Sequence, residues 1–537
     1  MSGIEEKGKS IEADASWEEE KMGHQHSAAE AAETEHSRTL WQALKAEPKA
    51  VMWSVAVSTA IIMEGYDIVL VTSLFAQNSF SRDYGSYSEG GGWQVAAKWQ
   101  SALGIAPIIG AIVGAFLNGW LTVKFGFRKV LLVSLLAMTL FIFLIFFAVN
   151  LTMILVGLIL CGISWGVFAT VGPAYAAEVC SLKLRGHLTV YVNLCWALGQ
   201  LISAGVLRGF ANNSTQWAYR IPFGLQWAWP IPLFAVLWFC PESPWWLVRR
   251  GRRSDALRCI GRLASKGSST SQEATLSLIE HTIMIEEEDR MEQSAGSFVD
   301  CFKGVDLRRT EIACMAFAAQ IWCGTPLGGT PAYFFVQAGL SSDNAFTFST
   351  MGLGIAAIGT IISWGLLSRF GRRTLYIWGL SALSVCLLVV GILSAADPSS
   401  ASSYAQAGII IAWMAIYYMT VGPICYAIIS EIGSVRLRNQ TVCLSRMAYY
   451  VCQVIGNVAH PYMVNPNEAN WQGKAGFFWG GTCALFFLWA FFRLPESKDR
   501  SFEELDILFN ERIPARKFST MKVNAYAERG QRIVVRE

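Results

Sequence analysis

Charged residues are scarce in this chain, and their scarcity excludes an ordinary soluble protein. Only 15% of the 537 residues are Asp, Glu, Lys or Arg, whereas 53% are hydrophobic and the mean hydropathy is +0.37. One soluble core of ordinary proportions does not bury that much apolar surface, so lipid must cover much of it. The small formal net charge of +3 gives no case for nucleic acid binding.

Support for enzyme chemistry is also lacking. The segment Gly162 to Gly166 matches the Gly-x-Ser-x-Gly pattern of a nucleophile elbow, but it lies inside a hydrophobic stretch without a neighbouring acid or base. The thirteen cysteines show no metal-like pairing, and we expect small buried apolar residues at positions such as Cys161 and Cys314. We therefore expect no enzyme, no metal site and no cofactor.

A cleavable signal peptide is not predicted either, because the first fifty residues are polar and contain no apolar core behind a basic start. Stretches long enough to span a bilayer follow from there. They lie near 51–73, 98–120, 128–148, 151–173, 187–208, 223–240, 311–337, 346–368, 374–394, 405–429, 441–462 and 475–493. The sequence predicts an all-α membrane protein with twelve transmembrane helices.

One polar pattern occurs twice along the chain. Gly172, Pro173, Tyr175, Glu178, Leu184 and Arg185 in the first half are matched by Gly422, Pro423, Tyr426, Glu431, Leu437 and Arg438 in the second. The two glutamates and the two arginines share a spacing of about 253 residues, roughly six spans with their loops. Two pseudo-symmetric six-helix bundles, with a binding site between them, are typical of transporters.

The repeat and the spans divide the chain into five regions. We expect a cytoplasmic tail over 1–50, a bundle over 51–240, a linker with short helices over 241–310, a second bundle over 311–493 and a tail over 494–537. Short basic loops stay in the cytoplasm. Lys124, Arg128, Lys129, Lys183, Arg185, Arg369, Arg372, Arg373, Arg436 and Arg438 all fall in loops on one side. Both termini are therefore expected to be cytoplasmic.

Three charges inside predicted spans point to function. Glu64 and Asp67 stand three residues apart in span one and share a helix face, where a charge is costly unless it meets a polar cavity or a partner. A carboxylate close to a second one is disposed to hold a proton. Arg446 in span eleven is the matching cation. His460, near the outer end of that span, is interpreted as a boundary residue.

The chain resembles fungal sugar porters of the major facilitator superfamily, and among them the alpha-glucoside (maltose-type) permeases. The superfamily resemblance rests on the repeated pattern and on Gly126 to Lys129, Pro241 to Pro244, Gly371 to Arg373 and Pro495 to Lys498. The alpha-glucoside resemblance rests on Met63 to Asp67, Tyr191 to Trp196, Tyr219 to Phe223, Pro244 to Arg249 and His460 to Pro466. It implies the major facilitator fold.

The resemblance also assigns roles to residues. It implies proton coupling through Asp67, Glu64 and Arg446. It implies sugar binding by the amides Asn193, Gln200 and Gln320, which supply the donors and acceptors that a neutral polyol requires, and by Tyr449 and Tyr450. It implies a cytoplasmic gate that joins the halves when the cavity faces outward, made by Arg128, Glu178, Arg185, Arg372, Glu431 and Arg438.

Several charges that the resemblance leads us to expect are missing. Val123 stands where the superfamily usually has an aspartate, and Leu158 in span four where it has Arg or, in the maltose type, Glu. Pro107 replaces a glutamate that alpha-glucoside permeases usually carry in span two, and Ser368 replaces the aspartate of the second loop. These departures weaken the inference of coupling and leave room for a substrate other than maltose.

The function expected is import of a sugar, such as the alpha-glucoside maltose, by proton symport through alternating access. A uniporter or an exporter of another small hydroxylated metabolite is the first alternative, and a sugar sensor that does not transport is the second. We expect a monomer in the plasma membrane, with sugar, protons and lipid as partners. Asn212 and Asn213 begin two overlapping glycosylation sequons on a short outer loop, and their use stays open.

Overall fold

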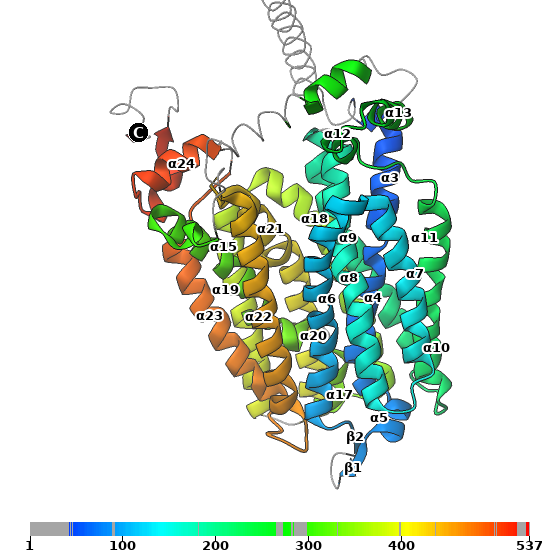
Figure 1. Ribbon diagram of the computed structural model, residues 1–537. Coiled ribbons are helices and arrows are strands. Elements are labelled where there is room, and N and C mark those ends of the chain that lie inside the picture. The colour runs from blue at the N-terminus through cyan, green and yellow to red at the C-terminus, as the bar shows by residue number, and fades with distance from the viewer. Residues whose placement is uncertain are drawn as a thin grey trace, which may run out of the picture.

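The computed structural model describes residues 42, 44–45, 47–88, 92–180, 182–264, 272–280, 283, 298–329, 331–396, 399–434, 437–498, 500, 502–523 and 533–535. Two helical bundles stand next to each other, and their long helices run in roughly the same direction (Figure 1). Each half of the chain builds one bundle, as the repeat predicts.

The first bundle contains the helices of the first half and a hairpin. Its elements are α3 (Pro48–Ser58), α4 (Ile61–Ser73), η1 (Leu74–Ala76), α5 (Asn78–Tyr84), β1 (Ser86–Ser88), β2 (Gly92–Gln94), α6 (Ala97–Phe125), α7 (Phe127–Phe146), α8 (Leu151–Val179), α9 (Leu182–Phe210), α10 (Trp217–Leu225), η2 (Gln226–Ala228) and α11 (Pro230–Leu237). The strands β1 and β2 pair antiparallel, with Tyr87 opposite Trp93. Two short helices, α12 (Pro244–Arg249) and α13 (Arg253–Leu263), follow.

The second bundle repeats the arrangement. Its elements are η3 (Asp300–Phe302), α15 (Gly304–Trp322), α16 (Thr325–Gly328), α17 (Ala332–Gln337), α18 (Ser342–Arg369), α19 (Arg372–Ala396), α20 (Ser400–Met419), α21 (Val421–Ile432), α22 (Arg438–Val464), η4 (Gln472–Lys474) and α23 (Ala475–Arg493). Four further elements end the described chain: α24 (Phe502–Asn510), η5 (Ala515–Thr520) and the antiparallel strands β3 (Met521–Val523) and β4 (Ile533–Val535).

Helices occupy all twelve predicted stretches, although not all are simple spans. Within the described residues, eight helical segments are long and apolar enough to cross a membrane. Of the other four stretches, span six is broken into α10, η2 and α11, and span seven into α15, α16 and α17. Pro230 begins α11, and Gly324, whose φ of 99° is left-handed, precedes α16. The helices α9 and α22 are continuous but carry polar side chains.

Small residues bring neighbouring helices into close contact. A Cβ added to Gly110 or Gly114 of α6 would collide with the backbone carbonyls of Ile159 and Ile163 on α8. The reverse holds for Gly162 on α8, where a Cβ would meet the carbonyl of Pro107. The glycines of the Gly-x-Ser-x-Gly pattern therefore serve helix packing.

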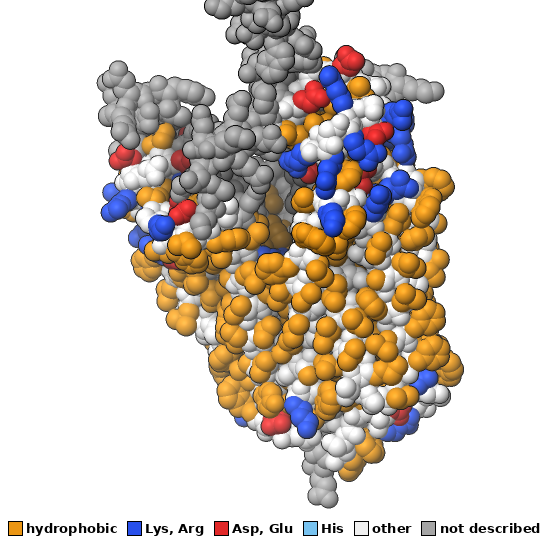
Figure 2. Space-filling view, viewed as in Figure 1, with side chains coloured by type: hydrophobic (Ala, Val, Ile, Leu, Met, Phe, Trp, Pro, Cys, Tyr) orange, Lys and Arg blue, Asp and Glu red, His pale blue; other side chains and the backbone are white. Residues whose placement is uncertain are grey.

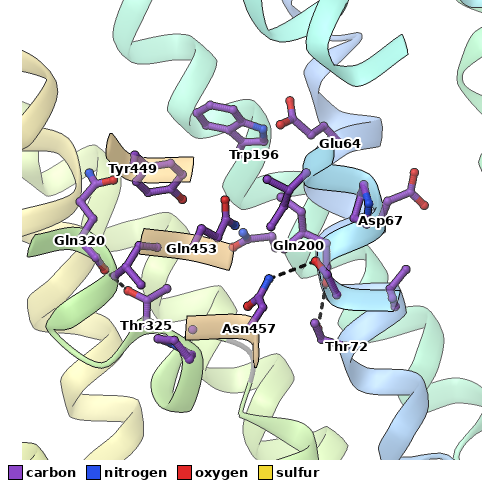
Figure 3. Close-up of a pocket in the computed structure, with 18 of the residues that line it drawn as sticks. Glu64, Asp67, Thr72, Trp196, Gln200, Gln320, Thr325, Tyr449, Gln453 and Asn457 are labelled. Carbon is purple, nitrogen blue, oxygen red and sulfur yellow. Dashed lines mark hydrogen bonds between the residues drawn. The ribbon is translucent and has the colours of Figure 1, made fainter. Parts of the chain in front are cut away.

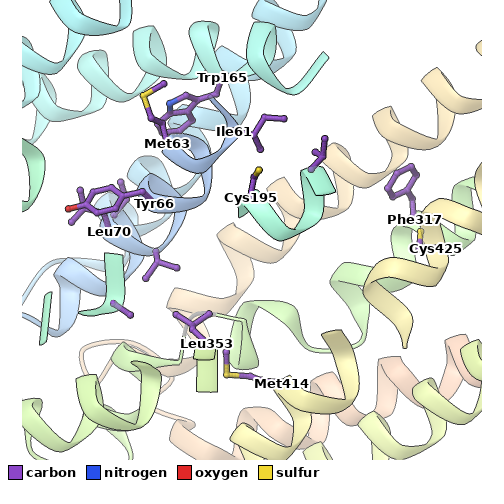
Figure 4. Packing of buried hydrophobic residues seen from close by; sticks show 14 of the residues in the cluster. Ile61, Met63, Tyr66, Leu70, Trp165, Cys195, Phe317, Leu353, Met414 and Cys425 are labelled. Carbon is purple, nitrogen blue, oxygen red and sulfur yellow. The ribbon is translucent and has the colours of Figure 1, made fainter. Parts of the chain in front are cut away.

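Each bundle also has an apolar interior of its own. In the first, Tyr66 and Leu70 of α4 are buried together with Trp165 of α8, and in the second Leu353 and Met414 are buried (Figure 4). The thirteen cysteines all lie in the described part of the chain and are unpaired, most of them buried. Nine are buried, as expected, whereas Cys314, Cys386 and Cys452 are half-buried and Cys443 is exposed.

The bundles meet chiefly where α9 packs on α18 and α6 packs on α22, and α17 makes a smaller contact with α4 and η1. We call the end that carries α12, α13 and α24 the basic end, and the opposite end, with α5 and the β1–β2 hairpin, the far end (Figure 1). In the described residues, hydrogen bonds between the bundles lie toward the far end and at middle depth. Gln100 and Gln94 bond the Tyr333 hydroxyl, and Asn465 Nδ2 donates to Val95 O at 3.1 Å.

The surface agrees with a membrane protein. Figure 2 shows an almost continuous apolar surface over the sides of the bundles, with Lys and Arg gathered at the basic end. Side chains such as Phe116, Leu140 and Trp378 are 71%, 60% and 71% exposed, which is favourable only against lipid. A hollow opens between the bundles at the basic end (Figure 2). The assignment of this end to the cytoplasm stays a prediction.

Candidate functional site

A cavity of about 280 Å³ lies between the two bundles. Its wall is formed by side chains of α4, α6, α8 and α9 from the first bundle and of α15 to α18 and α20 to α22 from the second. All eight residues predicted for coupling or sugar binding line it: Glu64, Asp67, Asn193, Gln200, Gln320, Arg446, Tyr449 and Tyr450. The structure therefore brings these residues together, and their roles stay predictions.

The carboxylates belong to the first-bundle wall. Glu64 lies beside the Trp196 ring, whereas Asp67 is directed away from the cluster of Gln200, Gln453 and Asn457 (Figure 3). Asp67 is 1% exposed, and its Oδ1 accepts a hydrogen bond from Nε2 of Gln226, which is also buried. Among the described residues no cation lies within ion-pair distance of either carboxylate.

Arg446 belongs to the opposite wall and is surrounded by aromatic rings. Its guanidinium lies 5.2 Å from the Tyr450 ring centre and 5.3 Å from that of Tyr449, and Phe317 and Trp196 are only slightly farther away. It donates to the hydroxyls of Tyr450 and Tyr426 at 3.4 and 3.3 Å. These contacts stabilise the buried cation, which also interacts electrostatically with Glu64.

The predicted amides differ in what they already bind. Gln320 donates from Nε2 to the backbone oxygen of Gly422 at 2.9 Å, within the second bundle. Gln200 accepts at Oε1 from the Tyr418 hydroxyl at 2.8 Å, which joins the two bundles across the cavity. The side chain of Asn193 has no hydrogen-bond partner within the described residues that the structure records. Asn193 is thus the freest of the three to bind a ligand.

Several lining residues were not predicted. Gln453, Asn457 and His460 follow Arg446, Tyr449 and Tyr450 along one face of α22, and all six line the cavity. Their spacing of three to four residues is a polar stripe at helical period, which sequence reasoning could have recognised. His460, interpreted as a boundary residue, lies in this wall and is buried at Nδ1. Tyr418 and Tyr426 of the second bundle had no comparable signal.

The predicted gate residues lie at the basic end, in two separate clusters. Arg372 binds Glu431 at 3.0 Å, and Ser497 donates to the same carboxylate at 2.6 Å. In the first bundle Glu178 accepts from Ser243 and lies 3.7 Å from Arg249. Each of these contacts stays within one bundle. The side chains of Arg185 and Arg438 lie outside the described residues, and the gate stays a prediction.

Arg128 contributes differently from Arg372. Its guanidinium donates to the backbone oxygen of Trp238, and its backbone N–H donates to the Glu242 carboxylate at 3.2 Å. Glu242 thereby caps the first turn of α7, as Glu496 caps α19 through the N–H of Arg372 at 2.8 Å. Burial raises the pKa of Glu242, and the backbone N–H groups that it accepts from oppose this rise.

A family model described as "Sugar (and other) transporter" matches residues 52–509. The chain belongs to this sugar transporter family. A general alpha-glucoside permease of Saccharomyces cerevisiae is 38% identical over 504 residues, covering 93% of this chain and 82% of that protein. The maltose permease MAL31 of the same yeast is 40% identical over 508 residues, with the same coverage.

Solved structures show the same fold for this family member. The E. coli xylose transporter XylE, in a partially occluded inward open conformation, matches 84% of this chain and 100% of its own with a TM-score of 0.66 at 17% identity. XylE bound to 6-bromo-6-deoxy-D-glucose, described as a proton:xylose symporter, matches 86% and 99% with a TM-score of 0.67 at 19% identity. This sugar transporter family member therefore has the major facilitator fold and is a multi-pass transporter rather than an enzyme.

Proposed function

We propose that this chain imports an alpha-glucoside by proton symport through alternating access. The observation that supports the proposal most is the cavity between the bundles, with two carboxylates in one wall and an arginine among tyrosines in the other. The similarity to yeast alpha-glucoside and maltose permeases supports the substrate class.

The lining suits a sugar in particular. Amides such as Asn193 and Gln453 both donate and accept hydrogen bonds, as the hydroxyl groups of a neutral sugar require. Tyr449 and Tyr450 offer aromatic faces to the apolar face of a pyranose ring. Specificity arises because a hydroxyl missing from the ligand leaves one of these buried amides unpaired.

Proton coupling would supply the energy of accumulation. Asp67 is the proposed proton carrier, because it is buried, borders the cavity and has a carboxylate neighbour, Glu64. A membrane potential of about 100 mV supplies about 2.3 kcal/mol per charge, which supports roughly fortyfold accumulation of a neutral sugar. A uniporter supports no accumulation.

Alternating access is favoured by the difference between the two ends. Hydrogen bonds such as that from Asn457 to Gly104 O, at 3.0 Å, join the bundles toward the far end. At the basic end a hollow separates them (Figure 2). Rocking of the bundles about the cavity would separate them at the far end and bring them together at the basic end. If the basic end is cytoplasmic, this is an inward-facing state.

The test uses the full chain in cells and in liposomes. Addition of maltose to expressing cells should alkalinise the medium, and uptake should stop when an uncoupler removes the proton gradient. A panel of labelled maltose, trehalose, sucrose, glucose and unrelated polyols in liposomes identifies the substrate. Uptake that does not change when the uncoupler is added would instead support a uniporter. The buried Leu158 in α8 favours this alternative, because it leaves span four without the expected charge.

A further inference from the structure

Gln226 is the hydrogen-bond partner of Asp67 and comes from a distant part of the chain. It begins η2, the short element at the break of span six, between Pro222 in α10 and Pro230 at the start of α11. Gln226 is 2% exposed, and Asp67 is 1% exposed. The carboxamide is therefore held against the carboxyl group where both side chains are almost fully buried.

One polar atom of each residue in this pair lacks a hydrogen-bond partner among the described residues. Asp67 Oδ2 and Gln226 Oε1 are both buried, and neither has a hydrogen-bond partner in the part of the chain that the structure describes. Both are acceptors while Asp67 is ionised. A proton on Oδ2 turns Asp67 into a donor, which can bond to Oε1 while Oδ1 still accepts from Nε2. One proton thus satisfies both atoms, as buried polar groups require.

Other ionisable groups around Asp67 are few, and none is a nearby cation. Glu64 lies one turn away on α4, and Tyr66 directly precedes Asp67 and interacts with it electrostatically. The elements packed against α4 add Cys161 on α8, Tyr191 and Cys195 on α9 and Tyr333 on α17. The part of α6 that lines the cavity, from Gln100 to Ala111, is uncharged. Arg446 borders the same cavity from the opposite wall, where it donates to Tyr426 and Tyr450 and interacts electrostatically with Glu64 rather than with Asp67.

We propose that Gln226 is a positioning residue that holds Asp67 in both of its protonation states. This rests on the proposed role of Asp67 as the proton carrier. The ionised carboxylate keeps the N–H bond, and the protonated acid forms two bonds with the carboxamide. A permanent cation in this place would favour the ionised form alone. The carboxamide binds either form, so that Asp67 can take up and release a proton during the cycle.

Charge substitutions at position 226 test the proposal through the pH dependence of equilibrium sugar exchange in liposomes. Exchange needs the protonated carrier, so its rate should fall as the pH rises through the pKa of Asp67, and Asp67→Asn should remove this fall. Gln226→Arg should move the midpoint to lower pH, and Gln226→Glu to higher pH, each by about one to three pH units. Gln77→Met alters a buried amide far from Asp67 that donates to Phe210 O, and should leave the midpoint unchanged.

The outcomes separate the two proposals. If wild-type exchange has no pH midpoint that Asp67→Asn removes, proton carriage by Asp67 fails, and the role of Gln226 fails with it. If the wild type has such a midpoint but the Arg and Glu variants leave it in place, or move it in the same direction, only the role of Gln226 is overturned. Opposite shifts support it.

Infrared difference spectroscopy between acidic and alkaline pH tests the protonated pair directly. The carboxylic acid band that disappears in Asp67→Asn belongs to Asp67. In Gln226→Met, which has a similar volume and no carboxamide, this band should move to higher wavenumber because the acid loses its hydrogen bonds. A band that stays in place would show that the protonated acid is not bonded to Gln226, even in a variant that is folded and exchanges sugar.

Discussion

The repeated glutamates make similar contacts in the two bundles, but the two bundles contribute different side chains to the wall of the central cavity. Glu178 and Glu431 each accept a hydrogen bond from the serine of a Pro-Glu-Ser segment, Ser243 and Ser497, and each has an arginine beside it. At the cavity the first bundle supplies carboxylates and the second supplies a cation and tyrosines. The repeated part suits a motion that both bundles share, and the unlike part suits the chemistry of sugar and proton.

The asymmetry is visible along the sequence. Glu64 and Asp67 have no acidic counterparts around Trp322 and Thr325, and Asn193 stands where Arg446 would have its counterpart. Substitutions at the centre should therefore have unequal effects, and paired substitutions at the repeat should have equal ones.

The largest effect is expected for Asp67→Asn. An amide cannot carry the proton, so accumulation should fall from roughly fortyfold to equilibrium, while exchange remains in part. The ratio of internal to external labelled sugar in energised vesicles measures this. Asp83→Asn changes an exposed carboxylate on α5 that bonds Tyr219, and should still accumulate sugar. Accumulation by Asp67→Asn would contradict proton carriage.

Removing the cation of the second bundle should have the next largest effect. Arg446→Gln deprives Tyr426 and Tyr450 of a charged donor and removes the one Lys or Arg among the described residues that line the cavity. Uptake should fall about 10- to 100-fold. Arg446→Lys keeps the charge and loses the planar contacts, so it should fall between the two. The measurement is the initial rate of labelled sugar uptake in both variants. A wild-type rate in Arg446→Gln would refute a role for the cation.

Removal of one amide from each bundle should have a smaller effect that differs between the two bundles. Asn193→Ala loses only hydrogen bonds to sugar and should weaken binding about 3- to 10-fold with little change in turnover. Gln320→Ala also frees the backbone oxygen of Gly422, just before Pro423, so both affinity and turnover should fall. Sugar affinity and single-turnover rates, measured separately, test this. Identical profiles for the two variants would be evidence against the difference.

The smallest effects are expected at the repeated pattern. Glu178→Gln and Glu431→Gln each weaken a partly exposed ion pair, with the Arg372–Glu431 side chains 20% and 24% exposed. Exchange should change by less than about fivefold in both variants, and by similar factors. The measurement is the sugar exchange rate of each variant and of the wild type at one fixed pH. A large loss in only one variant would show that the two copies do different work.

Much of the fold follows from local sequence properties. Hydrophobic length and loop charge predict the spans, because each depends on residues close together in the chain. The repeat predicts two bundles, because it can be recognised by comparing the two halves of the sequence. The breaks in spans six and seven were not predicted, although Pro222, Pro230 and Gly324 mark them. The polar face of α22 was predicted only at Arg446, Tyr449 and Tyr450. Helical period would have extended it to Gln453 and Asn457.

Partners that come from distant segments could not be predicted in this way. No local signal connects Gln226 to Asp67, which lie 159 residues apart, or Tyr418 to Gln200, which lie 218 residues apart. Both contacts depend on how helices from different spans approach one another. The eight predicted site residues all line the cavity, but which atoms they present to it depends on these partners.

The sequence by itself determined the membrane class, the duplication, the family and eight of the residues in the cavity wall, because composition, repeat spacing and short motifs are properties of the chain. Only the tertiary structure decided that Gln226 binds Asp67, that aromatic rings surround Arg446 and that the Asn193 amide has no hydrogen-bond partner among the described residues. The physical reason is that a buried polar atom must find its partner within hydrogen-bond distance, and helix packing sets that distance.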